Sequence, residues 1–147
     1  MAISFSRDLK NNMLNKAFIT SLAGSCGTAG TASLKIYTGT QPTNADAATS
    51  GVLLVTISNI GWGTSFGATN GTATLAIAAG YAGTAVTSGM ATWGRMECVT
   101  TGYTGSAATC RLDGEVSTVT GSTFVINNAS VETGAVITLQ SATIYLA

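Results

Sequence analysis

Short stretches of alternating apolar and polar residues recur along most of the chain, which is the pattern of β-strands with one buried face. In residues 34–37, Leu34 and Ile36 would face a core, while Lys35 and Tyr37 would face the opposite way. Gly and Asn turns separate about seven or eight such strands, so we predict a mainly β fold, a β-sandwich of jelly-roll or Ig-like topology. Further strands are expected within residues 52–55, 72–78, 91–119, 123–126 and 135–146.

Two segments interrupt this strand pattern. Residues 6–23 have helical periodicity, because Leu9 and Met13 stand four positions apart on one face and Ser6 is a suitable N-cap. This helix is expected either to pack on the β-sandwich or to dock on a neighbouring subunit. Residues 80–89 carry mostly small side chains and no charge. They are expected to form a plain surface loop, and the alternative is a loop that packs adaptably against a partner.

The last predicted strand, residues 135–146, has apolar residues on both of its faces. Ile137 and Leu139 alternate against Ala142 and Ile144, so no single face collects all of them. A strand of this kind is typical of the centre of a sheet or of a strand covered by another subunit, and not of a solvated edge.

The stretch from 91 to 119 predicts a hairpin whose two strands match each other in chemistry. One register brings opposite charges together on one side of the ladder and apolar groups together on the other. Exposed ion pairs contribute only about 0–1 kcal/mol each, so their main effect here is to fix the register. The predicted pairs are Arg95 with Asp113, Glu97 with Arg111, Cys98 with Cys110 and Met96 with Leu112.

A polar loop between the first two predicted strands belongs to the most distinctive segment of the chain. Residues 34–48 read LKIYTGTQPTNADAA, and a G-x-L-L strand starts at Gly51. With a helix before it and strands after it, this segment resembles a family of small structural proteins of tailed phages and prophages. The resemblance implies a virion component that is assembled in the host cytoplasm.

Composition agrees with a subunit of an assembly. The 147 residues are expected to form one domain, 1–147, with its β-sandwich over 33–147. Charged residues make up 8% of the chain, against about 25% in a typical domain, and the net charge is zero. A neutral, charge-poor surface tends to associate. The chain has neither the clustered Lys and Arg that nucleic acid requires nor an apolar run of about 20 residues that spans a membrane.

The residue types offer little for catalysis. The chain has no histidine, which removes Ser-His-Asp and Cys-His systems and His-containing zinc sites. Asp113, Glu115 and Glu97 could together bind Ca²⁺ or act as an acid/base pair. Arg95 and Arg111 balance two of these three acids, so a structural role is favoured. We therefore expect no catalytic, cofactor-binding or metal site.

The redox state of the predicted Cys98–Cys110 pair stays open at this point. A disulfide requires Cβ atoms about 3.5–4.5 Å apart, which only a non-hydrogen-bonded cross-strand site allows. A phage protein folds in a reducing cytosol, which favours free thiols. Cys26 has no evident partner, and the three cysteines lack the spacing of a metal site.

These observations lead to a non-enzymatic structural protein of a phage virion. We expect a capsid decoration or cement protein that binds the major capsid protein shell and stabilises it as a homo-oligomer, with a trimer favoured. A neck, tail or tail-fibre protein of the same family is the alternative. The candidate contact residues are Gln41, Asn44, Asp46 and Tyr103.

A carbohydrate-binding β-sandwich module is a third hypothesis, from a different class of function. Aromatic residues that bind sugars must be exposed and coplanar, and the candidates are Trp62, Trp93 and Tyr103. Trp93 can equally belong to the core, so its exposure distinguishes this hypothesis from the others.

Overall fold

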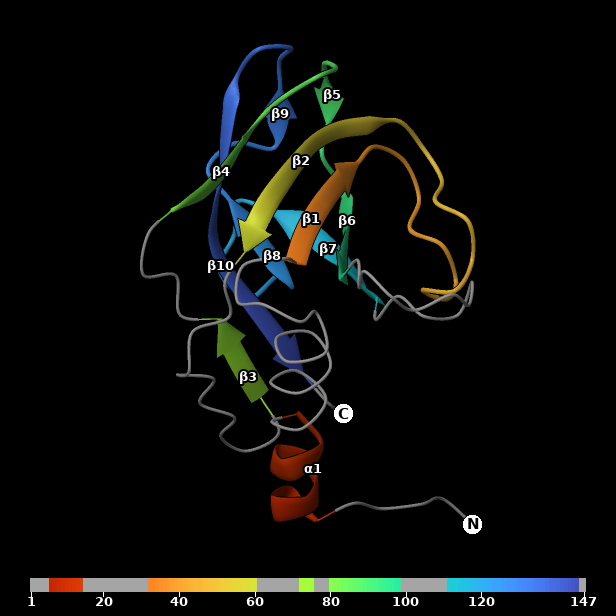
Figure 1. The fold of residues 1–147 in the computed structure, drawn as a ribbon, viewed down its shortest axis with the longest axis vertical. Helices are drawn as coiled ribbons and strands as arrows, with labels where there is room; N and C mark the ends of the chain where they lie inside the picture. The colour runs from red at the N-terminus through yellow and green to blue at the C-terminus, as the bar shows by residue number, and fades with distance from the viewer. Residues whose placement is uncertain (1–5, 15–31, 61–71, 76–79, 99–110, 146–147) are drawn as a thin grey trace.

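The computed structural model describes residues 6–14, 32–60, 72–75, 80–98 and 111–145. Their fold is mainly β with one short N-terminal helix, which confirms the predicted class (Figure 1). The elements are α1 (Arg7–Leu14), β1 (Ala32–Tyr37), β2 (Leu53–Ile60), β3 (Thr72–Leu75), β4 (Tyr81–Thr84), β5 (Gly89–Met90), β6 (Trp93–Cys98), β7 (Arg111–Ser117), β8 (Phe124–Ile126), β9 (Ser130–Val131) and β10 (Val136–Tyr145).

Eight of the strands form one curved sheet that nearly closes on itself. Its order is β2-β1-β6-β7-β8-β10-β3, with β4 also paired to β10, while β5 and β9 form a separate small ribbon. The pairing is antiparallel except between β7 and β8. After β4, the chain returns to β2, where the Val86 amide donates to the Leu54 carbonyl at 2.8 Å. The sheet thus encloses one core between opposed layers, as in a sandwich or a barrel.

The strand β4 lies where the sequence predicted a loop, and its small residues have a structural reason. A Cβ atom on Gly83 would lie 2.3 Å from the carbonyl oxygen of Thr56 on β2. Such a close approach between two backbones excludes any side chain at that position. The small residues of this segment are therefore what lets β4 approach β2 and nearly close the sheet.

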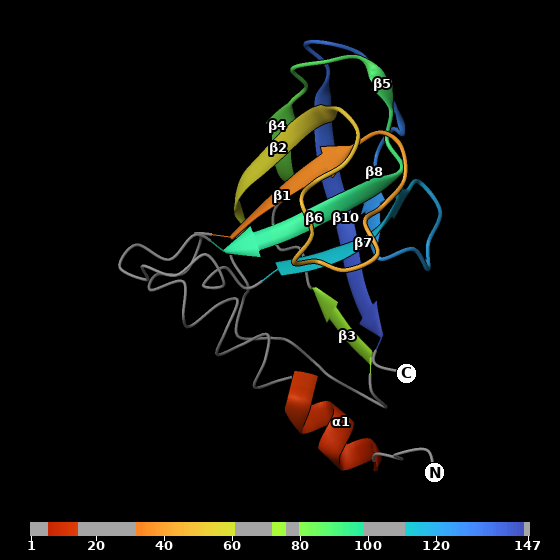
Figure 2. The same cartoon turned by 90° about the vertical axis from the view of Figure 1, so that its right-hand side faces the viewer.

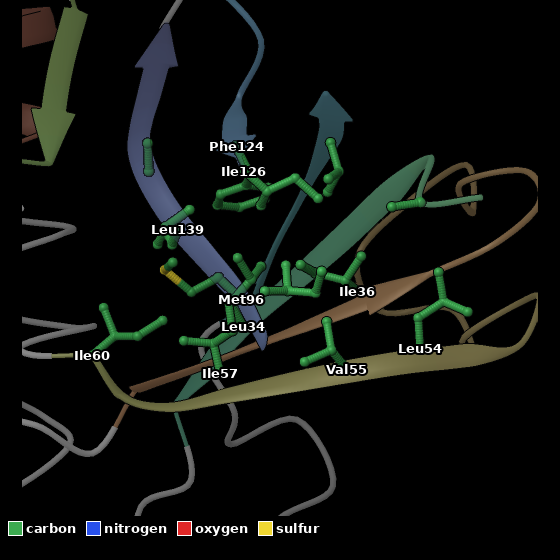
Figure 3. Close-up of a cluster of buried hydrophobic side chains, with 14 of the residues drawn as sticks. Leu34, Ile36, Leu54, Val55, Ile57, Ile60, Met96, Phe124, Ile126 and Leu139 are labelled. Carbon is green, nitrogen blue, oxygen red and sulfur yellow. The ribbon is translucent and has the colours of Figure 1, made fainter. Parts of the chain in front are cut away.

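The core fills the space inside the curved sheet. Leu34 and Ile36 are fully buried, as the alternation of β1 predicted. Figure 3 shows their side chains directed toward those of the neighbouring strands. Burial of one such side chain stabilises the fold by about 1.5–3 kcal/mol. The labelled members of this core are Leu34, Ile36, Leu54, Val55, Ile57, Ile60, Met96, Phe124, Ile126 and Leu139.

The strand β10 buries apolar residues from both phases of its alternation. Its pairing with β8 shifts register between Leu139 and Ser141, which is a bulge or a similar irregularity. An extra residue at such a site reverses the faces of the strand beyond it. Ile137 and Leu139 before the shift, and Ala142 and Ile144 after it, are consequently all buried. The prediction of a strand inside the sheet is confirmed, because β10 pairs on both edges.

The helix α1 begins as predicted, and lies beside β3 (Figure 2). The Leu9 amide donates to the hydroxyl of Ser6 at 3.3 Å, which is the expected N-cap contact. The remainder of the predicted helix, residues 15–23, lies outside the described residues. Leu9 and Met13 remain 46% and 40% exposed. Within the described ranges, no helix is long and apolar enough to cross a membrane.

Candidate functional site

The outer face of β1, β6 and β7 gathers half of the charged residues of the chain. The strand registers place Ile36 opposite Gly94 and Gly94 opposite Gly114 on the core side, so the intervening residues point outward. The chain has 6 basic and 6 acidic residues in total. Those on this face are Lys35, Arg95, Glu97, Arg111, Asp113 and Glu115.

The predicted hairpin register is present between β6 and β7. Arg95 pairs with Asp113, and Glu97 pairs with Arg111 across the ladder. The apolar pair Met96 and Leu112 faces the core side. Cys110 and the side chain of Cys98 lie outside the part of the chain that the structure describes, so their pairing stays a prediction.

Arg95 and Asp113 form a buried, bidentate ion pair. The Arg95 Nε and Nη2 atoms each donate to one carboxylate oxygen of Asp113, and both distances are 2.7 Å. Each side chain is only 4% exposed. The hydrogen bond with Asp113 raises the pKa of Arg95, although desolvation acts in the opposite direction. Both oxygens of Asp113 are thereby engaged in a charge-assisted interaction of fixed geometry.

Arg95 also binds the backbone of the loop that follows β1. Its Nη1 atom donates to the Ala47 carbonyl at 2.9 Å. Residues 38–52, which we call loop 38–52, therefore lie against the outer face of the sheet (Figure 2). Because this loop covers the ion pair, the burial of Arg95 and the position of the loop depend on each other.

Two residues that shortly precede Arg95 in the chain form hydrogen bonds with the start of loop 38–52. The Trp93 indole N–H donates to the Thr38 carbonyl at 3.3 Å, and the Thr92 hydroxyl donates to the Gly39 carbonyl at 2.7 Å. The Trp93 ring stacks on Tyr37 with centroids 4.6 Å apart and an interplanar angle of 13°. The Arg95 guanidinium carbon lies 5.8 Å from the centroid of the Trp93 ring, within cation–π range.

Loop 38–52 also closes on itself at its base. The Thr38 amide donates to the Val52 carbonyl at 3.0 Å, and the Val52 amide donates to the Thr38 hydroxyl at 3.0 Å. Gly51 adopts a φ of 77° at this point. A Cβ atom on Gly51 would lie 1.8 Å from the Thr38 carbonyl oxygen, so only glycine fits.

The predicted contact residues of loop 38–52 fall into two groups. Gln41, Asn44 and Asp46 are all exposed. The Asn44 side-chain oxygen accepts hydrogen bonds from the amides of Asp46 and Ala47, at 3.0 and 2.8 Å, and so shapes a turn within the loop. Asn44 is thus a structural residue of the loop, whereas Gln41 and Asp46 carry the exposed chemistry. Tyr103 lies outside the described residues.

The second predicted pair, Glu97 and Arg111, has the expected register, but Glu97 forms a salt bridge with another residue. Among the described residues, Glu97 forms its salt bridge with Lys35 on β1, although it stands opposite Arg111 on β7. The buried Nε atom of Arg111 finds no hydrogen-bond partner within the part of the chain that the structure describes. The predicted salt bridge follows from the hairpin of β6 and β7 alone, whereas β6 also pairs with β1 along its other edge.

The acidic residues do not converge as a metal site would. Within the described ranges, no group of three or more His, Cys, Asp or Glu side chains could hold a metal ion. Asp113 is committed to Arg95, and Glu115 is exposed and stands opposite Trp93. The possible Ca²⁺ site of Asp113, Glu115 and Glu97 is therefore not assembled among the described residues. Both carboxylate oxygens of Asp113 accept hydrogen bonds from Arg95, so this carboxylate is not free for an acid/base pair.

Trp93 cannot act as an exposed platform for sugars. It is 1% exposed, and one face of its ring is stacked on Tyr37. The other two aromatic candidates, Trp62 and Tyr103, lie outside the described residues. The structure thus removes Trp93 from the carbohydrate-binding hypothesis and assigns it to the support of loop 38–52.

Comparisons with known proteins add no relative to this description. A scan against protein-family models, a search of curated proteins and a search of solved structures each give no match to the chain.

Proposed function

We propose that this chain is a non-enzymatic structural protein of a tailed-phage virion, and that it acts as a capsid decoration or cement protein. The observation that carries the proposal is the structure of loop 38–52, which contains most of the segment that resembles such proteins. Its loop is exposed at Gln41 and Asp46, yet a buried ion pair holds its backbone through Ala47. An exposed loop with a fixed backbone suits a repeated, specific contact between protein subunits.

The use of charge in the molecule supports this proposal. Half of the charged residues lie on one sheet face, where Arg95 is bound to Asp113 and Lys35 to Glu97. Few charges then remain for the rest of the chain, so the polarity of its surface must come largely from Thr, Ser, Asn and Gly. Such a surface favours association with other proteins over solubility as a free monomer.

Exposed apolar side chains suit contacts between copies of the chain. Val52, Val86, Met90 and Val136 are each more than half exposed. Their backbones lie near the end of the sheet that carries β5 and β9, where β2 and β10 begin and β4 ends (Figure 1). We propose a homo-oligomer, with a trimer favoured, that sits on the shell of the major capsid protein in the virion.

Difference imaging of particles tests the proposal and separates it from its alternative. Electron cryomicroscopy would compare particles of the encoding phage with particles made without this chain. Density lost from the outer surface of the shell supports a decoration protein. Density lost from the neck, tail or tail fibres would assign the chain to those structures instead. Particles identical in both maps would contradict a structural role.

A further inference from the structure

We infer that the exposed side of loop 38–52 is a preformed recognition surface for a protein partner and that Arg95 is its positioning residue. This inference rests on the proposed function and names the surface that would perform it. The partner fitted by this surface is a protein face that offers amide and hydroxyl groups, together with one cationic side chain opposite Asp46.

The attachment of the loop leaves its backbone little freedom. Arg95 binds the carbonyl of Ala47 near the middle of the loop, while Trp93 and Thr92 bind its first carbonyls. The hydrogen bonds between Thr38 and Val52 close its base. A loop that is already ordered loses less conformational entropy when it binds, which is how preorganisation increases affinity.

The buried ion pair indicates that Arg95 serves to hold the loop in place and not only to stabilise the fold. Replacement of a buried ion pair by apolar residues of similar volume is often neutral or stabilising. An apolar pair in place of Arg95 and Asp113 could pack on the outer face of β6 and β7 beneath the loop, but it could not donate a hydrogen bond to Ala47. The guanidinium satisfies Asp113 with two of its nitrogens and the loop with the third.

The exposed side chains of the loop define the partner. Thr40, Gln41 and Thr43 present hydroxyl and amide groups, and Asp46 presents a carboxylate. The described residues show no side-chain partner for the Asp46 carboxylate, so it is available to a cation. The loop contains no Lys or Arg, which disfavours nucleic acid or anionic lipid as the partner.

The test uses purified full-length protein and particles of the encoding phage that were assembled without this chain. The double variant R95M/D113L removes the tether to Ala47 while keeping the site filled, and E115Q changes an exposed carboxylate on the same sheet face. Binding to the particles should fall by at least about tenfold for R95M/D113L and stay within about twofold for E115Q. Proteinase K cleavage within residues 39–51 should become faster in R95M/D113L, with the circular dichroism of the fold retained.

A second variant covers the case in which R95M/D113L does not fold. T40A/Q41A/D46A leaves Arg95 and Asn44 in place and should also lose at least about tenfold in binding. Normal binding by T40A/Q41A/D46A would overturn the inference, as would normal binding by a folded R95M/D113L whose loop is cleaved faster. Binding to a glycan array that depends on the same three residues would assign the loop to sugars and also overturn it. If wild-type protein does not bind the particles, the proposed function fails together with the inference, whereas indifferent loop variants defeat the inference alone.

Discussion

Arg95 and Asp113, which stand opposite each other on β6 and β7, are joined by two parallel hydrogen bonds of 2.7 Å beneath loop 38–52. Each side chain is 4% exposed, so the pair is almost completely removed from water. A surface pair at this register would contribute little beyond alignment of the strands. Because the pair is buried, removal of either partner would leave an uncompensated charge in the protein. The hydrogen bond from Arg95 to the Ala47 carbonyl also couples the pair to the position of the loop.

Removal of one partner of this pair should destabilise the protein strongly. The change R95A leaves the Asp113 carboxylate buried without a counter-charge, which costs about 3–5 kcal/mol of the free energy of unfolding. R95M/D113L removes both charges and should lie within about 1.5 kcal/mol of wild type. Urea unfolding followed by circular dichroism measures both. If the single and the double variant are equally unstable, the cost does not arise from an unpaired buried charge.

Gly51 should tolerate no side chain, because of both its backbone angle and its contact with Thr38. G51A combines the strain of an alanine at φ 77° with a Cβ atom 1.8 Å from the Thr38 carbonyl oxygen. We expect a loss of at least about 2 kcal/mol in the free energy of unfolding. G134A is the matched control, since Gly134 has a φ of 86° and open space around its Cβ position, and should lose about 1 kcal/mol. Equal losses in the two variants would show that the contact of Gly51 with Thr38 is unimportant.

The near closure of the sheet between β4 and β2 depends on Gly83. In G83A, the new methyl group would lie 2.3 Å from the Thr56 carbonyl oxygen and would push β4 away from β2. We expect a loss of about 1–3 kcal/mol, as for other overpacked sites. G80A is a control because its Cβ would meet only a side-chain methyl of Thr138 at 3.0 Å, and it should stay within about 0.5 kcal/mol of wild type. Thermal unfolding of both variants would measure this difference, and an unaffected G83A would argue against close contact between β4 and β2.

Alkaline pH should not release loop 38–52. The pKa of Arg95 is raised above its ordinary value by the hydrogen bond with Asp113. A group whose pKa is higher in the folded state contributes stability that is fully present below its unfolded pKa and is lost only as pH rises through its folded pKa. Arginine is effectively always protonated in proteins, so both pKa values lie above the pH range compared here. Proteinase K cleavage within residues 39–51, corrected for the activity of the enzyme, should therefore be equal at about pH 8 and about pH 10. Faster cleavage at the higher pH in wild type, but not in R95M/D113L, would contradict this.

The hairpin of β6 and β7 could be predicted because its information is local. Opposite charges and apolar residues match across the two strands in one register only, and a shift by one residue would reverse every face. The predicted position of Arg95 opposite Asp113 is confirmed. Glu97, which the hairpin matches with Arg111, forms its salt bridge with Lys35 on β1 instead. The hairpin sequence carries no information on β1, which comes from a distant part of the chain and pairs with the other edge of β6.

The features that escaped prediction depend on backbone geometry. Strand β4 has no alternating pattern, since its approach to β2 requires small residues such as Gly83. The register shift after Leu139 changes which residues of β10 face the core. The apolar residues change phase there, but the sequence alone does not distinguish a bulge from a strand covered on both faces. The bond from Arg95 to Ala47 ends at a carbonyl group, which every residue has. The sequence therefore predicts that this loop is exposed, but not what holds it in place.

The most direct test of the proposed function is the number of copies of this chain in a purified virion. Quantitative mass spectrometry of particles from the encoding phage would compare its abundance with that of the major capsid protein. We predict a copy number comparable with that of the capsid protein, as a decoration of the whole shell requires. A few copies per particle would place the chain in the neck or tail, and its absence from the particle would contradict a structural role in the virion.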